Sequence, residues 1–170
     1  MERKEVHLRP HRGYAFAVKL DMLKAHDRVE WHFLEAILIR LGFNMVFVRL
    51  IMKCVSSVRF SVRVNGKLLP FFTPSRGLRQ GDPASPYLFL LCAEGFSSLL
   101  KYYNGGIIDR GLRVSYRSPW ISHLLFADDS LIFIDAIDQS ALRLNEILRI
   151  YGDASGQCVN RDKSSIYFSI

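Results

Sequence analysis

Alternating and helical patterns of hydrophobic residues divide the chain into short strands and amphipathic helices. The apolar run at 14–20 (YAFAVKL) is typical of a buried strand, and Asp21 follows at its end. Asp27 and Glu30 form a capping-box pattern that predicts a helix start, and Gly42 is expected to end that helix. Six apolar positions between them follow helical spacing: Val29, Phe33, Leu34, Ile37, Leu38 and Leu41.

The middle of the chain predicts a second helix followed by a β-hairpin. Asn44 is expected to cap a helix that runs to about Ser56. Residues 58–64 alternate between apolar and polar side chains, which predicts a half-buried strand with a basic outer face. The Asn65-Gly66 pair is a favoured two-residue hairpin turn. Because the return strand contains Pro70, we expect it to lie at a sheet edge.

Three further segments complete the predicted fold. Asp82 is expected to cap a helix that has Pro83 near its first turn. Residues 124–133 (LLFADDSLIF) predict a strand, a two-residue turn and a strand, and residues 165–170 predict a final strand. The intervening helix has apolar residues at i, i+3, i+4 and i+7: Leu144, Ile147, Leu148 and Tyr151. This order of elements indicates an α+β fold in which helices back an antiparallel sheet.

The composition is that of a globular protein, because 49% of the residues are hydrophobic and 23% are charged. The 170 residues suffice for one domain with a hydrophobic core. The longest run without a charged residue, 83–93, is too short for a membrane span, which needs ~20 apolar residues. No apolar signal core follows the charged N-terminus. Cys54, Cys92 and Cys158 lack CxxC spacing, which favours a reduced intracellular protein without a zinc module.

Charge is distributed unevenly along the chain, whose net charge is +7. Residues 36–81 contain no acidic residue and eight basic ones: Arg40, Arg49, Lys53, Arg59, Arg63, Lys67, Arg76 and Arg79. Four aspartates crowd into a short later segment: Asp128, Asp129, Asp135 and Asp138. A broad positive field around a negative focus suits a bound polyanion and a bound cation. An ordinary solvated basic face explains the charge pattern equally well.

The Asp128-Asp129 pair stands between two apolar strands, at the predicted hairpin tip. Aspartates are common in turns, so a lone pair of this kind needs no function. Asp21, however, also ends an apolar strand, and the carboxylates converge if the two strands are neighbours. A divalent cation would relieve their repulsion, and two Mg²⁺ ions would suit phosphoryl transfer. Two carboxylates could instead serve as acid and base on a sugar, but the basic surroundings favour a phosphate substrate.

Four segments together resemble the palm motifs A to D of reverse transcriptases. In chain order they are KLDMLKAHDRVEW (19–31), GLRQGDPASPYLFLL (77–91), FADD (126–129) and SGQCVNRDKSSIYFS (155–169). The details resemble the non-LTR, LINE-type retrotransposon branch, particularly plant copies. The match is colinear from about Gly13 to the end of the chain. The resemblance implies a palm-like antiparallel sheet with a βαββαβ core backed by helices.

The resemblance also implies a metal site that binds two Mg²⁺ ions, or Mn²⁺ in their place. In motif A, Asp21 would bind both metals, and the backbone carbonyl of Met22 would bind one of them. In motif C, Asp128 would be the second bridging ligand and Asp129 a supporting carboxylate. The implied reaction joins a primer 3′-hydroxyl to the α-phosphate of a dNTP on an RNA template. The implied partners are therefore RNA template, DNA primer and dNTP, with no membrane.

Five more residues acquire roles only through the resemblance. Arg79, Gln80 and Gly81 would line the nucleotide and template pocket, and Gly81 would let a base pair approach the backbone. Lys163 matches the lysine proposed in the family to protonate the pyrophosphate leaving group, although the residues alone indicate a solvated surface lysine. His26 stands where the family usually carries Tyr or Phe beneath the incoming sugar. We therefore expect weaker rejection of ribonucleotides, poorer dNTP binding, or both.

The resemblance makes residues 1–170 a palm-centred fragment, without most of the fingers and without the thumb. We expect exposed apolar surface where those parts would pack, and an intracellular location, in the nucleus or cytoplasm. Ala84 replaces a usual Leu and is expected to leave a void costing ~1–3 kcal/mol. Arg59 and Arg63 would contact template phosphate, or their stems would pack over the core. The alternatives are a module that binds RNA or RNA–DNA duplex without chemistry, and an inactive truncated retroelement remnant.

Overall fold

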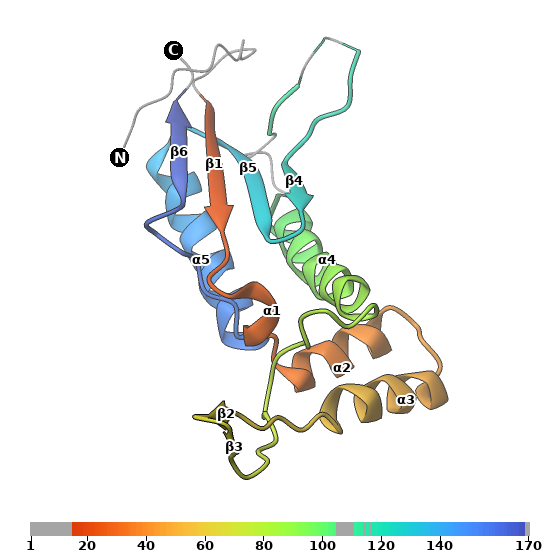
Figure 1. Cartoon of the computed structure of the whole chain (residues 1–170). Coiled ribbons are helices and arrows are strands. Elements are labelled where there is room, and N and C mark those ends of the chain that lie inside the picture. Colours follow the sequence, from red (N-terminus) through yellow and green to blue (C-terminus); the bar gives the residue numbers. More distant parts are fainter. Residues whose placement is uncertain (1–14, 105–110, 114, 116, 169–170) are drawn as a thin grey trace.

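The computed structural model describes residues 15–104, 111–113, 115 and 117–168, which include all the elements labelled in Figure 1. They are β1 (Ala15–Asp21), α1 (Ala25–Arg28), α2 (Trp31–Arg40), α3 (Met45–Ser56), β2 (Arg63–Val64), β3 (Lys67–Leu68), α4 (Ser85–Asn104), β4 (His123–Phe126), β5 (Asp129–Asp135), α5 (Asp138–Ser155) and β6 (Ser165–Phe168). Tyr14 and residues 169–170, which the sequence assigned to strands, lie outside the described residues. In the described part of the chain, no helix combines the length and apolarity needed to cross a bilayer.

One four-stranded sheet in the order β4-β5-β1-β6 organises the molecule. All its neighbouring strands are antiparallel, and residues of helices α4 and α5 pack into one core with residues of the sheet (Figure 1). Strands far apart in the chain become neighbours, because β1 lies between β5 and β6. The predicted α+β class, with an antiparallel sheet backed by helices, is confirmed.

The two faces of this sheet differ in what covers them. Side chains alternate along a strand, and directly opposed residues of antiparallel strands share a face. On one face, Val18, Leu20 and Ile132 are buried in the core that includes residues of α4 and α5. On the other, Ala17 and Phe133 are buried near one end. Toward the opposite end this second face, which we call the open face, becomes accessible.

The helix between residues 27 and 41 does not start as the sequence predicted. Asp27 lies in the separate short helix α1, and α2 begins only at Trp31, with no side-chain cap at its N-terminus. The capping-box prediction is wrong because Glu30 has other partners. Its carboxylate lies 3.2 Å from the guanidinium of Arg76, and its backbone N–H donates to the carbonyl of Ser155. By contrast Asn44 caps α3 as predicted, since its side chain accepts the N–H of Val46.

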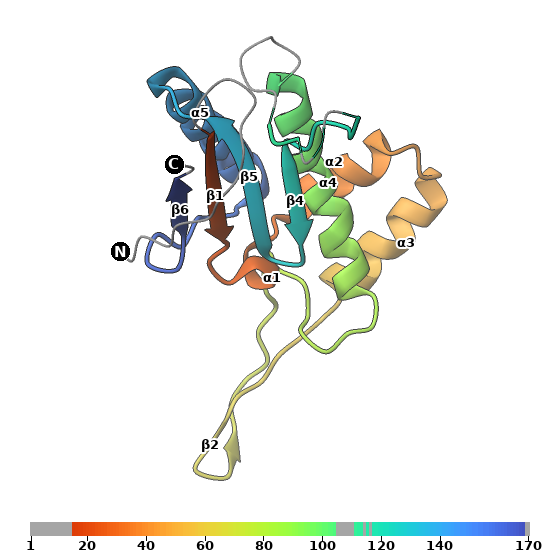
Figure 2. The same cartoon turned by 90° about the horizontal axis from the view of Figure 1, so that it is seen from above.

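Residues 58–74, which we call the arm, project away from the rest of the chain (Figure 2). The predicted half-buried strand at 58–64 is wrong: β2 and β3 are two residues long and exposed on both faces. Within the described part of the chain, no core covers β2 and β3 to bury the apolar face of the arm. The Asn65-Gly66 turn forms as predicted, with positive φ at both residues. The pairing shifts by one residue between the Val62–Leu69 bond and the Phe60–Phe72 bridge, a bulge that contains Pro70.

Helix α4 begins later than the sequence predicted, at Ser85 rather than directly after Asp82. The Asp82 carboxylate accepts the N–H of Ala84, so it caps the turn before the helix, and Pro83 lies in that turn. Ala84 lines a cavity of about 200 Å³, but the alanine itself is exposed. A cavity open to water does not carry the full penalty of a core void. The predicted loss of ~1–3 kcal/mol is therefore too large for this site.

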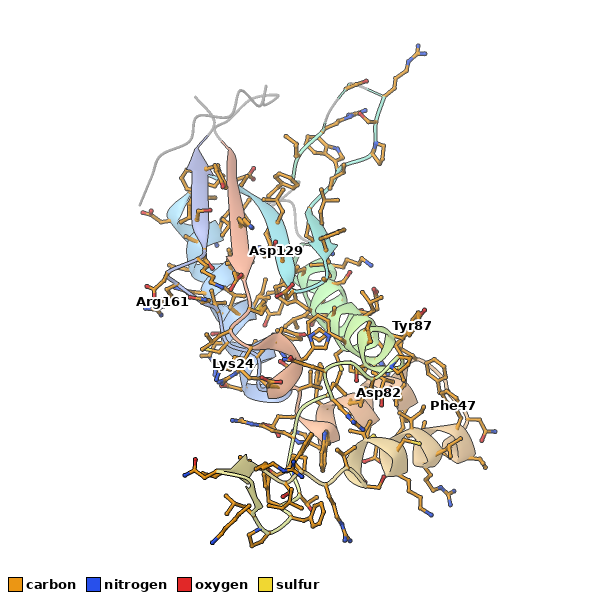
Figure 3. The ribbon with its side chains drawn as sticks, viewed as in Figure 1. Lys24, Phe47, Asp82, Tyr87, Asp129 and Arg161 are labelled. Carbon is orange, nitrogen blue, oxygen red and sulfur yellow. The ribbon has the colours of Figure 1, made fainter. Side chains whose placement is uncertain are left out.

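Exposed apolar surface is extensive, as the sequence analysis expected. Val46 on α3 is 74% exposed, Phe71 on the arm 68% and Phe126 on β4 83%. Phe47, on the same helix as Val46, is also exposed and is labelled on α3 in Figure 3. That fingers and thumb segments would cover this surface stays a prediction.

Candidate active site

The three predicted metal-binding aspartates belong to one end of the sheet, where β1 ends beside the start of β5. Figure 3 labels Asp129 at this end. Asp21 and Asp129 are directly opposed in the antiparallel register. Directly opposed residues have Cα atoms about 4.5–5.5 Å apart and share a face. Both aspartates therefore lie on the open face, half-exposed. The two strands are neighbours, as the predicted convergence of Asp21 and Asp128 requires, but the residue directly opposite Asp21 is Asp129.

The hairpin turn consists of Ala127 and Asp128, so Asp129 belongs to β5 and not to the tip as the sequence predicted. Asp128 is exposed. It also lines a small cavity with Met22 and Phe89. Ala127 has a φ of 51°, in the left-handed region that favours glycine. The register of β4 and β5 holds this turn in place, since Phe126 pairs with Asp129.

The carboxylates are close in the backbone, but their side chains do not form a ready metal-binding group. Among the described residues, no three His, Cys, Asp or Glu side chains are gathered so that they could hold an ion. The ammonium group of Lys19 lies 3.3 Å from the Asp129 carboxylate. Lys19 stands two residues before Asp21 on the same strand face. The donor set, carboxylate oxygens without sulfur or imidazole, matches the chemistry of a hard divalent cation. Binding would require that the Lys19 ammonium move away from Asp129.

The backbone of Asp21 is held from both sides by a segment that follows α5. Its N–H donates to the hydroxyl of Ser164 at 3.2 Å, and its carbonyl accepts the N–H of Asn160 at 2.8 Å. Sequence reasoning missed both residues, although they lie in the segment that resembles motif D. Met22 forms an antiparallel β-bridge with Val159, and one backbone hydrogen bond lies on each side of this bridge. Neither hydrogen bond uses the backbone carbonyl of Met22. It is therefore not used by this pairing.

The same segment is anchored through Gly156 and Gln157 at the end of α5. The guanidinium of Arg28 donates to the carbonyl of Gly156 at 2.8 Å, and the side-chain amide of Gln157 donates to the carbonyl of Ala25 at 2.8 Å. Gln157 is buried, so its bond to α1 is shielded from water. The chain from α5 to β6 is thus fastened to the residues that follow Asp21 and then to Asp21 itself.

His26, in α1, contacts α4. Its ring stacks on the ring of Phe89, with centroids 4.6 Å apart and planes 20° apart. Its backbone carbonyl accepts the N–H of Leu78, which ties the segment after β1 to the loop before α4. Gly77 in that loop has a φ of 91°, and a Cβ there would lie 2.7 Å from the carbonyl oxygen of Asp27. This close approach requires glycine.

The predicted nucleotide-binding residues lie in the same loop. Arg79 and Gln80 are exposed, and the Gln80 amide donates to the Asp27 carboxylate at 3.2 Å. Gly81 has a φ of 84°, and a Cβ built on it meets no atom within 4 Å. The space over its backbone is therefore open to a ligand. Lys163 is exposed in the turn before β6, and within the described residues no ion pair joins it to the three aspartates.

Burial shifts the pKa of two side chains, those of His123 and Cys92, in the direction that favours the neutral form. Burial lowers the pKa of His123, and nearby Lys101 lowers it further against the opposing effect of Glu94. The two ring nitrogens of His123 lie within hydrogen-bonding distance of Ser97 and Ser122 hydroxyls, which link β4 to α4. Burial also raises the pKa of Cys92 to about 12. His123 is directly opposite the buried Ile132, so it lies on the core face of β4 and not on the open face.

Comparison with known proteins adds three findings. The model of the family described as reverse transcriptase (RNA-dependent DNA polymerase) matches residues 2–169. An uncharacterized mitochondrial protein of Arabidopsis thaliana is 44% identical over 107 residues, 62% of this chain and 85% of that protein. An uncharacterized 149 kDa protein of transposon TX1 from Xenopus laevis is 30% identical over 167 residues, which are 96% of this chain but 12% of that protein.

The solved structures that match include telomerases, and at this level of identity they show the fold alone. Telomerase from Candida tropicalis, in complex with a fragment of telomeric RNA, superposes with a TM-score of 0.71 and 13% identity. That match covers 95% of this chain and 26% of the telomerase. Telomerase from Candida albicans matches with a TM-score of 0.63 and 17% identity, over 89% of this chain and 26% of its own.

Proposed function

The chain belongs to the reverse transcriptase (RNA-dependent DNA polymerase) family, in its non-LTR retrotransposon branch, and on that premise we propose that it is the palm of a DNA polymerase that copies RNA. A primer 3′-hydroxyl attacks the α-phosphate of a dNTP, and pairing with the RNA template selects the base. Residues 1–170 act as the palm, and fingers and thumb segments of a longer protein grip template and primer. The same proposal includes an intracellular site of action, in the nucleus or cytoplasm.

The observation that carries this proposal is the cross-strand pairing of Asp21 with Asp129 beside the turn residue Asp128. Like charges directly opposed on a sheet destabilise it, so their retention needs a compensating cation. Lys19 supplies one positive charge, at 3.3 Å from Asp129. A doubly charged ion would neutralise the group more completely.

The three aspartates and the Met22 carbonyl would hold two Mg²⁺ ions, or Mn²⁺ in their place. When bound, such ions supply Lewis-acid stabilisation of the charge that develops on the phosphoryl oxygens. The chain's own residues position the reactants. Lys163 holds a proton at its ammonium group for the pyrophosphate leaving group, as its resemblance to the motif D lysine suggests.

Arg79, Gln80 and Gly81 form the proposed nucleotide and template pocket. The exposed guanidinium of Arg79 attracts phosphate, and Gln80 is oriented by its bond to Asp27. The open space over the Gly81 backbone lets a base pair lie against it. These roles come from the motif B resemblance, and the exposure of all three residues supports them.

The test is primer extension on an RNA template by this chain joined to the fingers and thumb segments of the longer protein, with Mg²⁺ present and then removed by a chelator. We expect incorporation that requires the metal, the template and dNTPs complementary to it. The binding module is the second candidate, favoured by the acid-free basic segment at 36–81. Salt-sensitive binding of RNA–DNA duplex without any extension would favour that candidate over the polymerase.

Replacing His26 by tyrosine is expected to sharpen the preference for dNTPs over rNTPs. The imidazole already stacks flat on Phe89, so a phenol ring can take the same place and extend farther toward the sugar. A steric difference of this size changes discrimination by about 10–200-fold. Single-nucleotide incorporation with dNTP and rNTP gives the ratio for each protein.

His32→Tyr is the matched control, because His32 is exposed on α2 and outside the described nucleotide pocket. We expect it to leave the ratio at the wild-type value. Equal ratios for wild type and His26→Tyr would refute the role of position 26 in sugar selection.

A further inference from the structure

A small cavity lies on the core side of the sheet, behind the hairpin turn that joins β4 and β5. Four of the residues that line it carry polar side chains: Asp128, Ser130, Tyr151 and Gln157. The rest of the lining is apolar and includes Phe89 and Phe96 of α4. The cavity has a volume of about 10 Å³, close to the ~10–15 Å³ that one water molecule needs. Because a purely apolar cavity stays dry, the polar side chains decide whether this one can hold water.

The side-chain oxygen of Gln157 lacks a hydrogen-bond donor. The residue is only 7% exposed, and among the described residues none donates a hydrogen bond to its Oε1 atom. The amide nitrogen of the same side chain donates to the carbonyl of Ala25 at 2.8 Å, so exchanging the oxygen and the nitrogen would place two carbonyl oxygens together. A buried amide oxygen is expected to have a partner. Since Gln157 lines the cavity, a donor held there can reach it.

Two hydroxyl groups at the cavity can complete the hydrogen bonds of a bound water. Ser130 is 6% exposed and stands directly opposite Leu20 of β1, so its side chain lies on the core face of the sheet. The phenol of Tyr151 donates to the carbonyl of Cys92 at 3.4 Å, and its oxygen can still accept a hydrogen bond. With the oxygen of Gln157, these groups supply the ~3 partners that a buried water usually has.

We propose that the cavity is a binding site for one water molecule that links Gln157 to Ser130. The water donates hydrogen bonds to the Gln157 oxygen and to the Tyr151 phenol oxygen, and it accepts one from the Ser130 hydroxyl. A bridge of this kind is nearly as favourable in enthalpy as a direct hydrogen bond. The water site rests on the cavity and on the buried oxygen, and it does not depend on the proposed function.

The bridge makes Gln157 a positioning residue for the proposed catalytic aspartates. Its amide already holds the segment that follows Asp21, through the carbonyl of Ala25. The water extends this hold to Ser130, the residue that follows Asp129 in β5. Both strands that carry the carboxylates are then fastened to one side chain. This consequence for the reaction, unlike the water site itself, rests on the proposed function.

A crystal structure of the wild type tests the site directly. We expect one ordered water within hydrogen-bonding distance of both the Gln157 oxygen and the Ser130 hydroxyl. A dry cavity would overturn the proposal, and so would a Gln157 oxygen that accepts its hydrogen bond from a protein group. Because no catalysis is involved, a chain that cannot extend primers still gives a clear result.

Two substitutions and their combination test the bridge in solution. Gln157→Met keeps the length of the side chain but removes its polar atoms, and Ser130→Ala removes the hydroxyl. We expect each to lower the melting temperature by about 2–12 °C, because each leaves buried polar groups with fewer partners. The combined loss should be smaller than the sum, since Gln157→Met already deprives Ser130 of the shared water. The bond to Ala25 is absent from the single and the double variant alike, so it cancels from the comparison.

Ser97→Ala is the matched control for Ser130→Ala. Ser97 is also buried, at 5% exposure, but its hydroxyl contacts His123 and it does not line the cavity. Combined with Gln157→Met, it should give losses that add. Additive losses in the Ser130 pair would overturn the proposal. Equal departures from additivity in both pairs would also overturn it, because they would show coupling through the core in general.

Primer extension tests the positioning role, in the chain joined to the fingers and thumb segments of the longer protein. We expect Gln157→Met to lower kcat by about 10–100-fold, the loss typical of residues that orient metal ligands, and to leave the KM for dNTP unchanged. A raised KM with unchanged kcat would place Gln157 in nucleotide binding and overturn its positioning role. A wild type without any extension would refute the proposed function, whereas the crystal structure and the melting temperatures still decide the water site.

Discussion

Asparagine at position 21 is expected to abolish metal-dependent primer extension while leaving the fold intact or slightly stabilised. Asp21 stands directly opposite Asp129, so Asp21→Asn removes one of two like charges on the same sheet face. It also removes a carboxylate from the proposed metal site. We therefore expect the stability of Asp21→Asn to stay the same or rise while its primer extension falls. Replacement of an aspartate with a purely structural role would not separate stability from activity in this way.

The expected loss of extension is about 10²–10⁴-fold, because a metal-bound transition state is stabilised by several kcal/mol and each ~1.4 kcal/mol is tenfold. The second readout is the melting temperature with and without Mn²⁺. A ligand that binds only the native state raises it, by an amount that grows with the ratio of ligand to Kd. We expect a rise of several degrees in the wild type and none in Asp21→Asn.

The matched control is Asp153→Asn, on the exposed face of α5. Asp153 pairs with Arg149, but exposed pairs of this kind contribute little to stability. We expect its extension and its response to Mn²⁺ to equal the wild type. If Asp21→Asn keeps the full Mn²⁺ response, the carboxylates do not share an ion, and the polymerase proposal loses its support.

Substitutions of Asp128 and Asp129 distinguish between two assignments of the second bridging metal ligand. The resemblance assigns the bridging role to Asp128, whereas the register places Asp129 opposite Asp21 and next to Lys19. If Asp128 is the ligand, Asp128→Asn should lose both extension and the Mn²⁺ response. Asp129→Asn should then lose less, because its carboxylate is already partly neutralised by Lys19. The reverse order would transfer the bridging role to Asp129.

Periodicity predicted the parts of the fold that depend on local sequence and on burial. The apolar runs before Asp21 and around FADD become β1, β4 and β5 because one face of each is buried against helices. Asn44 and the Asn65-Gly66 turn are also where the sequence placed them, since caps and tight turns depend on few neighbours. The meeting of Asp21 with the FADD hairpin followed from two apolar strand ends.

Hydrogen bonds and ion pairs between distant segments could not be predicted from the apolar pattern. Ser164 and Asp21 are 143 positions apart, and a serine that accepts a backbone N–H has no signature in the sequence. The capping box failed for the same reason, because Glu30 is drawn to Arg76, 46 positions away. The prediction for the arm was wrong for a different reason. Its apolar and polar residues do alternate, but within the described part of the chain no core buries the apolar side of its two short strands. Alternation therefore predicted a strand that is almost wholly exposed.

The supporting segment behind Asp21 leads to the second large effect, at Gly156. Gly156 ends α5 with a φ of 78°, and a Cβ there would lie 2.4 Å from the backbone carbonyl oxygen of Arg28. That carbonyl cannot swing aside cheaply, because it belongs to α1 and the chain on both sides is fixed. The side chain of Arg28 donates a hydrogen bond to the backbone carbonyl of Gly156. Two residues later, the backbone N–H of Glu30 donates to the backbone carbonyl of Ser155.

Gly156→Ala is therefore expected to destabilise the fold by about 2–5 kcal/mol, from ~1–2 for the left-handed backbone and ~1–3 for the overlap. At ~2–4 °C per kcal/mol, thermal unfolding should show a drop well beyond measurement error. Gly42→Ala is the control, because Gly42 has a φ of 85° but no atom within 4 Å of a Cβ. It should lose only the backbone contribution. Equal losses in the two variants would mean that the contact with Arg28 relaxes at no cost, and that the segment is free to move away from Asp21.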